Sequence, residues 1–423
     1  MVRYLVPLVM LLAGCQTEPA AAVRRVRIAA SGPLGKVAPD ADDGYAALAA
    51  DLVYESLLRL GRDGSLQPGL VKSFKRLDFR RMQLDIPTDV SFSDGSKVGA
   101  PDVLAALAKS GLRVTEQQQQ VLVESTSEFL PLDLRMVESA VARKVPSGSI
   151  GTGPFVVVEE DPSHILLRRR VPAKGKFDEV LLTSYPSGRD AFAHTLNGGA
   201  DLLPIVDPRT LEFFAGVPSL KLLSSPAIHS FLVSFNSKRL DAATRRELTA
   251  SISSERVSGA AFGLSACVPS RDQHGDAAET LKAGVPLKVL AIIGQERAAL
   301  AVRRELGLRG GEIEILDTTA FIERVKQGDF DLVLLDVLIP TPAMAQLNWH
   351  TGSRLNFGYS NALVDAALDK GDLQGAAKEL ELDPPATFIC KKERIAVVDS
   401  RIKNAQLGPF GLLETLPDWE VTP

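Results

Sequence analysis

The sequence is poor in the patterns that build catalytic and metal sites. Five histidines are scattered along the chain, with no two at the spacing of helical metal ligands: His164, His194, His229, His274 and His350. The HExxH and CxxC patterns of metal sites and the GxSxG turn of serine hydrolases are also missing. We therefore expect no catalytic residue, no metal and no cofactor, and we expect that the protein is not an enzyme.

Basic charge and aromatic rings are also sparse. The 48 Lys and Arg residues are outnumbered by 52 Asp and Glu residues, which gives a net charge of -4 and leaves no basic excess for nucleic acid. Aromatic residues make up 6% of the chain, and its two indoles are Trp349 and Trp419. A sugar site built on stacked indoles is therefore not expected.

The N-terminus carries the pattern of a secretion signal. Arg3 precedes an apolar stretch, Tyr4–Leu12, that is shorter than the roughly 20 residues of a membrane span. Residues Leu12–Cys15 then resemble the lipobox of bacterial lipoproteins, which implies that Cys15 is lipidated and becomes the new N-terminus. An ordinary signal peptide and a buried N-terminal helix are the alternatives. Gln16 replaces the Asp that favours inner-membrane retention, so the choice of membrane stays open.

Two cysteines remain after Cys15, namely Cys267 and Cys390. They lie in a chain that the signal sends to an oxidising compartment, where disulfides persist. A disulfide would require their Cα atoms to lie within about 7 Å of each other. The sequence is equally compatible with two separate buried thiols, so both interpretations stay open.

Length and periodicity indicate an α/β protein with two lobes. The 423 residues exceed the roughly 250 to 300 residues at which a single core stops growing. Val23–Ser31 is predicted to be a strand, and Gly44–Leu60 has the spacing of an amphipathic helix that Gly61 terminates. Residues 286–337 alternate strand, helix, strand, helix and strand, which builds a second, parallel sheet with helices on its faces.

A glycine-rich stretch, Gly148–Glu160, reads GSIGTGPFVVVEE. Its three glycines and one proline precede an apolar run, as in a phosphate-binding loop. In such a loop the glycines open a helix whose free N–H groups bind the anion. Here they precede two apolar runs that Asp161 and Pro162 separate, a pattern typical of a β-hairpin. We therefore predict that residues 151–154 open a strand and bind no nucleotide.

Six stretches follow one another in the order found in a known family. They are LVYESLLRLGRDGSLQPGLVKSF (52–74), DVSFSDGSKVGAPDV (89–103), IGTGPF (150–155), NGGADLLPIV (197–206), LVSFNSKR (232–239) and NFGYSNALVDAAL (356–368). Together they resemble the family 5 extracellular solute-binding proteins, the peptide- and nickel-binding components of ATP-driven importers. The order extends across nearly the whole chain after the signal.

The resemblance implies a two-lobed periplasmic-binding-protein fold, type II-like, that encloses its ligand between the lobes. The implied parts are the signal peptide (1–15), a tether (16–22), lobe one (23–236) with a shortened extra subdomain (45–146), a hinge region (237–265), lobe two (266–390) and a return to lobe one (391–423).

One departure from the family bears on the ligand. Peptide binders of the family follow a lobe-two strand with "gw.aDypDP", in which the first Asp pairs with the α-amino group of the peptide. The corresponding run here is FDLVLLDVLIPTP, where Pro342 would align with the last proline, Leu338 and Ile339 occupy the anchor position, and Asp336 lies nearby. A buried ammonium without a carboxylate is strongly disfavoured, so ordinary peptide capture is not expected.

Ligand contacts are expected at strand ends that face the cleft between the lobes. The candidates are Ser31, Gly32, Thr152, Gly153, Asn236, Asp336, Asn348, Trp349, Asn356 and Tyr359. Structural roles are the alternative: the glycines would shape turns, Asn236 would satisfy hinge backbone groups, and Trp349 would belong to the core.

The resemblance implies a monomeric solute-binding lipoprotein of an ABC importer on the periplasmic side of the cell envelope. Such a protein captures a peptide-like or other small solute and delivers it unaltered to a permease. The alternative is an envelope lipoprotein that keeps this fold but serves as a sensor or a protein-interaction partner.

Overall fold

The computed structural model describes most of the chain after the signal. The described residues are 23–41, 44–62, 64–78, 80–108, 110–118, 120–125, 132–146, 148–204, 206, 210–227, 229–262, 267–270, 284–338, 345, 348–351, 353, 356–409 and 411–421. The lipobox with Cys15 and the motif positions Ile339 and Pro342 lie outside them. Within these ranges, no helix combines the length and the apolar character that crossing a membrane requires.

The first lobe is built on a seven-stranded sheet. Its strands, in spatial order, are β10 (Phe155–Glu160), β11 (His164–Arg169), β12 (Glu179–Tyr185), β1 (Arg25–Ser31), β13 (Leu202–Leu203), β21 (Ile395–Asp399) and β14 (Leu220–Ser224). Strand β1 is parallel to β12 and β13, and the other pairs are antiparallel. The predicted first strand and the predicted hairpin of β10 and β11 are therefore confirmed.

Helices cover both faces of this sheet. They are α1 (Gly44–Val53), α4 (Gly188–Leu196) and α5 (Leu211–Ala215). Successive residues of a strand point to opposite faces, so Ile28 packs in the core that contains α1, whereas Ala29 packs in the core that contains α4 and α5. The chain ends on the α1 side with β22 (Ile402–Lys403), the 3-10 helix η3 (Leu416–Asp418) and β23 (Glu420–Val421).

An inserted subdomain with its own core lies between α1 and β10 in the chain. It contains β2 (Leu58–Leu60), β3 (Leu66–Pro68), β4 (Ser73–Arg76), β5 (Arg81–Asp85), α2 (Ala100–Leu107), β6 (Leu112–Gln117), β7 (Gln120–Ser125), α3 (Leu132–Glu138), β8 (Ala142–Val145) and β9 (Gly148–Gly151). The extra subdomain was expected from residue 45 onward, but α1 packs on the first sheet instead.

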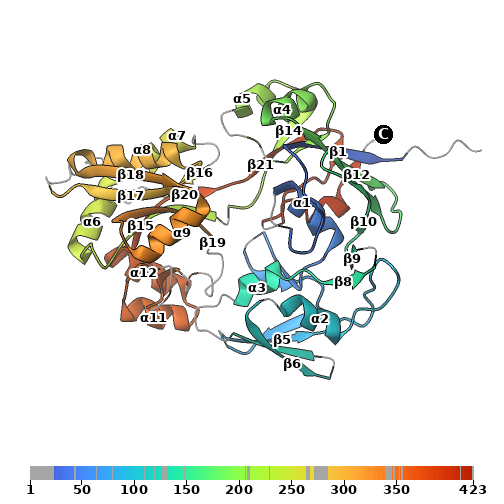
Figure 1. Cartoon of the computed structure of the whole chain (residues 1–423), viewed down its shortest axis with the longest axis horizontal. Coiled ribbons are helices and arrows are strands. Elements are labelled where there is room, and N and C mark those ends of the chain that lie inside the picture. Colours follow the sequence, from blue (N-terminus) through green and yellow to red (C-terminus); the bar gives the residue numbers. More distant parts are fainter. Residues whose placement is uncertain are drawn as a thin grey trace, which may run out of the picture.

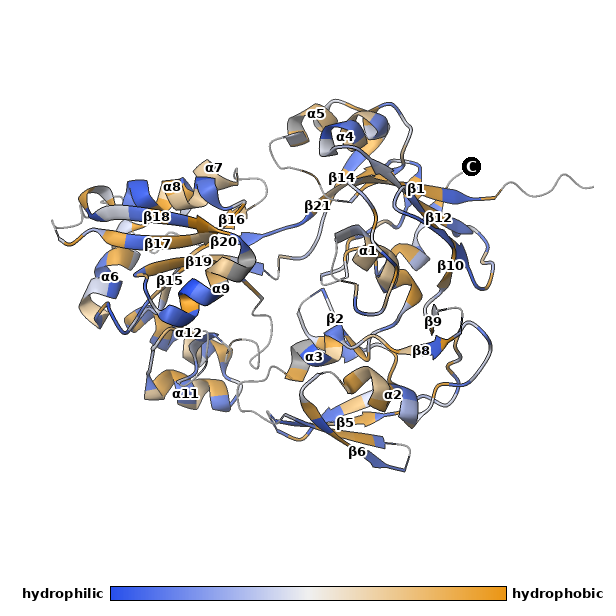
Figure 2. Ribbon diagram, viewed as in Figure 1, coloured by the Kyte–Doolittle hydropathy of each residue, from blue (hydrophilic) through white to orange (hydrophobic). Residues whose placement is uncertain are grey.

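The second lobe is built on a six-stranded sheet. Its strands, in spatial order, are β16 (Cys267–Pro269), β20 (Ala386–Lys392), β15 (His229–Phe235), β19 (Leu332–Leu338), β17 (Leu287–Ile292) and β18 (Gly310–Leu316). Its helices are α6 (Ala242–Ser251), α7 (Ser254–Ala261), α8 (Glu296–Glu305), the 3-10 helix η2 (Gly307–Arg309), α9 (Thr318–Gln327), α11 (Ala362–Asp369) and α12 (Leu373–Leu382). Figure 2 shows that β15, β19 and β20 are hydrophobic along most of their length.

The alternating pattern predicted for residues 286–337 is confirmed. Strand β17 pairs in parallel with both β18 and β19, and α8 and α9 form the two crossovers. Each crossover returns the chain to the same sheet in the same direction, as the sequence pattern requires.

Two bodies joined by two chain crossings make up the molecule (Figure 1). The chain leaves the first lobe between Ser224 and His229 and returns to it between Lys392 and Ile395. The expected boundary at Asn236 lies one strand too late, because β15 already belongs to the second sheet. The expected hinge of residues 237–265 is also wrong in its described part, since α6 and α7 pack into the second core.

The helix predicted for Gly44–Leu60 is shorter than its pattern indicates. Helix α1 ends at Val53, and Leu58 already begins β2. The carbonyl oxygen of Val53 accepts a hydrogen bond from the backbone N–H of Gly153 at 2.9 Å, which replaces the bond that a further helical turn would supply. A Cβ atom on Gly153 would come within 2.6 Å of the Leu52 oxygen, so this close approach requires glycine.

Candidate functional site

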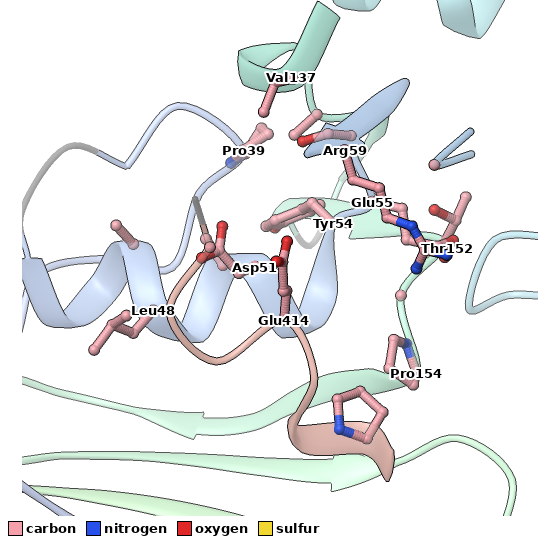
Figure 3. A pocket seen from close by; sticks show the side chains of 18 of the residues that line it. Pro39, Leu48, Asp51, Tyr54, Glu55, Arg59, Val137, Thr152, Pro154 and Glu414 are labelled. Carbon is pink, nitrogen blue, oxygen red and sulfur yellow. The ribbon is translucent and has the colours of Figure 1, made fainter. Parts of the chain in front are cut away.

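A cavity of about 1410 Å³ lies in the first lobe (Figure 3). Its walls come from α1, the start of β2, the end of α3, the Thr152–Pro154 turn, the end of β11 and the segment that contains Glu414. Arg394, in the second crossing between the lobes, also lines it. The cavity therefore reaches the connection between the lobes, although the sheet and helices of the second lobe contribute no lining residue in the described part of the chain.

Helix α1 presents one face to the cavity and buries the other. Gly44, Leu48 and Asp51 line the cavity at the helical spacing of three and four residues. On the opposite side, Ala49 and Val53 are buried in the core of the first lobe. This amphipathic arrangement fixes the direction in which Asp51 points.

The C-terminal segment brings a second carboxylate to Asp51. Gly411 packs so closely against α1 that a Cβ atom there would lie 2.9 Å from Asp51 Oδ2. Glu414 follows three residues later, and Figure 3 shows the Asp51 and Glu414 side chains directed into the same part of the cavity, beside Tyr54. Two residues from opposite ends of the chain thus form one acidic pair.

The protein environment raises the pKa of both carboxyl groups of the pair. Burial raises the pKa of Asp51 to about 6, against the opposing effect of Arg394. Burial and the charge of Asp51 raise the pKa of Glu414 to about 7, although Arg59 and Arg394 act against this rise. Asp51 is open to the cavity yet surrounded by protein on most sides, so water hydrates its charge poorly.

Donors are scarce around this acidic pair. Among the residues that the structure describes, no side chain or backbone N–H donates a hydrogen bond to Asp51 or Glu414. The guanidinium group of Arg170 donates instead to the backbone oxygens of Ser91, Phe92, Thr152 and Gly153, at 2.7 to 3.3 Å. The cavity therefore offers more charged acceptors than donors.

Arg59 and Glu55 form the other charged part of the cavity. Burial raises the pKa of Glu55, while Thr152, Arg170 and Arg59 lower it. Within the described ranges, the Arg59 side chain makes no hydrogen bond and acts on Glu55 and Glu414 through charge alone.

Two of the residues predicted from the sequence, Thr152 and Gly153, line the cavity. Thr152 is 6% exposed and lies beside Glu55 in Figure 3, and its hydroxyl makes no hydrogen bond of ordinary geometry. Ser31 and Gly32 do not line the cavity. Ser31 Oγ lies 3.2 Å from Tyr45 Oη, and Gly32 adopts a positive φ of 79° at the turn that follows β1.

The predicted asparagines of the second lobe bind backbone rather than the cavity. Asn236 is 3% exposed and donates to the carbonyl oxygens of Gly328 and Phe330, which ties the end of β15 to the loop before β19. Asn356 donates to the oxygens of His350 and Tyr359 at 2.8 Å. For Asn236 the structure shows the backbone role that the sequence left open.

The remaining predicted residues around α11 and α12 are buried. Asn348 is 6% exposed, Trp349 packs against Phe388 at 5.6 Å between ring centroids, and Tyr359 donates its hydroxyl to the Asp383 oxygen at 3.0 Å. Trp349 and Tyr359 belong to one hydrophobic cluster, and none of the three lines the cavity.

Asp336 is paired by side chains of its own lobe. Lys392 Nζ donates to Asp336 Oδ2 at 2.6 Å, and His229 Nδ1 lies 3.5 Å from Asp336 Oδ1. Burial raises the pKa of Asp336, but His229 and Lys392 outweigh that effect and hold it below its usual value. The carboxylate nearest to the expected peptide anchor therefore already has a cation.

Cys267 and Cys390 form a disulfide that joins β16 to β20, with their Cα atoms 5.3 Å apart. Of the alternatives that the sequence left open, the structure contains the bonded one. In the described part of the chain, no group of three or more His, Cys, Asp or Glu side chains is placed to hold a metal ion.

Sequence reasoning missed most of the charged residues of the cavity. Asp51, Glu55, Arg59, Arg394 and Glu414 were not among the candidates. One weak signal was available, because Asp51 interrupts the apolar residues of its helix. Nothing in the local sequence around Arg394 or Glu414 indicates that they approach α1.

Comparisons with known proteins bear on the fold. No family model and no curated protein matches the sequence. Among solved structures, a putative peptide-binding protein AppA from Clostridium difficile matches with a TM-score of 0.74 and 16% identity, over 94% of this chain and 100% of that one. NikA from Brucella suis, in complex with Fe(III)-EDTA, matches with a TM-score of 0.73 and 15% identity, over 94% and 100%.

A third match is AgaA from A. tumefaciens R10, in complex with agropinic acid, with a TM-score of 0.71, 16% identity and coverage of 94% and 99%. All three matches span both lobes and the inserted subdomain, since they cover nearly the whole described chain. The fold predicted from the resemblance is therefore confirmed: the chain has the two-lobed α/β fold of the family 5 solute-binding proteins.

Proposed function

We propose that this chain is the solute-binding component of an ABC importer. The observation that carries the proposal is the match of fold over 94% of the chain to binding proteins, at coverage of 98% or more of each of those chains. The cavity in the first lobe supports it, because small-molecule sites are typically concavities in which a few polar or charged groups orient the ligand. The protein captures its cargo without altering it.

Capture follows from the two crossings between the lobes. A solute that enters the cavity of the first lobe and also touches the second lobe stabilises the closed arrangement, and a permease recognises that arrangement. Arg394 lines the cavity from within one crossing, so bound solute lies next to the segment about which the lobes move.

The cargo is not held as a peptide amine on the second lobe. Asp336 is paired with Lys392 and approached by His229, so a peptide ammonium would have to displace a cation already present. Other proteins of this fold bind Fe(III)-EDTA and agropinic acid, so the fold is not restricted to peptides.

The binding proposal is tested on the purified chain that begins after residue 15. Peptide, amino-acid, amine and carboxylate pools are screened by thermal unfolding, and hits are verified by native mass spectrometry. A solute at 100 times its dissociation constant is expected to stabilise the folded state by about 2.7 kcal/mol. Binding with mass unchanged after incubation supports the proposal. Silence across all pools favours the alternative, a lipoprotein that serves as a sensor or interaction partner, and turnover of any hit would mean an enzyme.

The lipid anchor is a separate part of the proposal. It rests on the lipobox resemblance of residues Leu12–Cys15. We expect the mature chain to begin at an acylated Cys15 and to fractionate with membranes, whereas Cys15→Ser abolishes acylation and releases the chain. Mass spectrometry of the N-terminal peptide from both chains decides this point, and it also shows whether an ordinary signal peptide is removed elsewhere.

A further inference from the structure

The charged side chains that line the first-lobe cavity differ in whether they have hydrogen-bond partners. Three arginines of its wall donate their guanidinium groups to backbone oxygens: Arg170 to four of them, Arg169 to those of Phe177 and Pro417, and Arg394 to those of Gly408 and Pro409. The carboxylates of Asp51 and Glu414 receive no hydrogen bond from any described residue. The described part of the wall therefore supplies no hydrogen-bond donor to these two carboxylates.

A second observation points to the same wall. Thr152 is 6% exposed and lines the cavity, and its hydroxyl oxygen makes no hydrogen bond of ordinary geometry, although Thr152 lies close enough to Glu55 to lower the pKa of that carboxyl group. Buried polar atoms in folded proteins nearly always have a well-formed hydrogen bond, so the Thr152 hydroxyl has capacity for a further bond from a ligand atom beside Glu55. Figure 3 shows Thr152 and the acidic pair on walls of one space.

We infer that the Asp51–Glu414 pair receives a cationic nitrogen of the solute, an ammonium or guanidinium group that donates N–H hydrogen bonds to both carboxylates. This inference rests on the proposed function and names the chemical class of its cargo. It moves the cation anchor from the second lobe, where Asp336 is already paired, to the first lobe. The cargo is a small organic amine or guanidine, free or as part of a larger polar molecule.

Because the carboxyl groups of the pair titrate near neutral pH, the affinity for a cationic solute is expected to depend on pH. The charged and titratable groups that face the pair are Arg394 from the crossing, Arg59 from β2, and Tyr54 and Glu55 from the segment that follows α1. Since the pKa of Glu414 is about 7, a bound cation must displace its proton at acidic pH. The Glu414 proton alone makes the affinity about 100-fold weaker at pH 5 than on the plateau above pH 7, and protonation of Asp51, whose pKa is about 6, weakens it further.

Titration calorimetry with putrescine and agmatine, at pH 5 to 8, tests the inference. Choline is the charge-matched probe without N–H donors, and succinate is the anionic probe. We expect putrescine or agmatine to bind with proton release, with affinity that rises with pH, and at least tenfold more tightly than choline. Glu414→Gln and Asp51→Asn are expected to weaken binding at least tenfold at pH 8, whereas Glu381→Gln, on an exposed part of α12, leaves it unchanged.

The outcomes separate this inference from the proposed function. If the wider screen finds a solute that lacks a cationic nitrogen, or whose affinity is unaffected by Glu414→Gln, the inference is wrong and solute binding stands. If neither the four probes nor any pool stabilises the folded chain, both fail. Unfolding curves of each variant, recorded without probe, distinguish a lost ligand contact from a lost fold.

Discussion

Replacing Glu414 by Gln is expected to stabilise the protein without ligand at neutral and alkaline pH. The carboxyl group of Glu414 has its pKa raised from 4.5 to about 7, first by burial and then by the charge of Asp51. In the unfolded chain the same group titrates near its ordinary value. Between about pH 4.5 and pH 7, the folded state therefore binds more protons than the unfolded state, and stability falls as the pH rises.

The size of the effect follows from the two pKa values. A rise from 4.5 to about 7 corresponds to roughly 3 kcal/mol once the pH exceeds the folded-state value. Glu414 is partly exposed to the cavity, so water screens part of this penalty, and we expect about 1 to 2 kcal/mol. Gln has nearly the same shape and carries no charge, so the variant avoids the penalty at every pH.

Urea unfolding of wild type and Glu414→Gln at pH 4.5, 6, 7 and 8 measures this difference. The two curves should coincide near pH 4.5 and diverge up to pH 8, with the variant more stable. Glu381→Gln serves as the control, because Glu381 is an exposed glutamate of α12 outside the cavity. A constant difference at all four pH values, or a variant less stable at pH 8, would refute the reasoning.

Three further substitutions test the close contacts of the fold. Gly151→Ala places a Cβ atom 1.9 Å from a backbone oxygen at the end of α1 and should destabilise by about 3 kcal/mol in urea unfolding, whereas Gly188→Ala meets nothing within 4 Å and should be neutral or slightly stabilising. Arg170→Ala removes four bonds to backbone oxygens and should lower amide exchange protection at the junction with the inserted subdomain. Cys390→Ser removes a disulfide between residues 123 apart and should lower the free energy of unfolding by about 2 to 5 kcal/mol. Thermal unfolding measures this loss, and reductant should have no further effect on the variant. An unchanged unfolding midpoint would contradict a disulfide between Cys390 and Cys267.

The sequence predicted the fold correctly where the fold depends on contacts between segments that are close together in the chain. Residues 286–337 alternate two periodicities over short distances, and each crossover has one sterically favoured hand, so the pattern predicts its own topology. The entry to β10 was readable because proline and paired apolar runs are incompatible with a helix at that place. Both predictions depended on contacts that are close in sequence.

The sequence did not predict the lobe boundary, because this boundary depends on strand pairs that are distant in the chain. Strand β15 is buried along nearly its whole length, a pattern that suits a central strand of either sheet. Its partners, β19 and β20, follow about a hundred residues or more later in the chain. Asn236 therefore looked like the end of the first lobe, whereas it closes the first strand of the second.

The site was predictable only where the backbone itself forms the wall. Thr152 and Gly153 line the cavity because glycine is required where the turn meets α1, and glycine punctuation is visible in a sequence. The acidic pair has no such signal, since Asp51 and Glu414 stand near opposite ends of the chain and meet only in the folded lobe. The candidate residues of the second lobe were polar residues that satisfy its own backbone.

Lys392, the last residue of β20, and Arg394, in the crossing that follows it, connect the charges of the two lobes. Lys392 neutralises Asp336 of the second lobe, and two residues later Arg394 acts by charge on Asp51 and Glu414 of the first. A cation bound by the acidic pair would offset its negative charge and so reduce its attraction for Arg394. We therefore expect occupancy of the cavity to alter the forces on the segment that connects the lobes. The proposed importer role requires such a coupling, since a permease has to distinguish a loaded binding protein from an empty one.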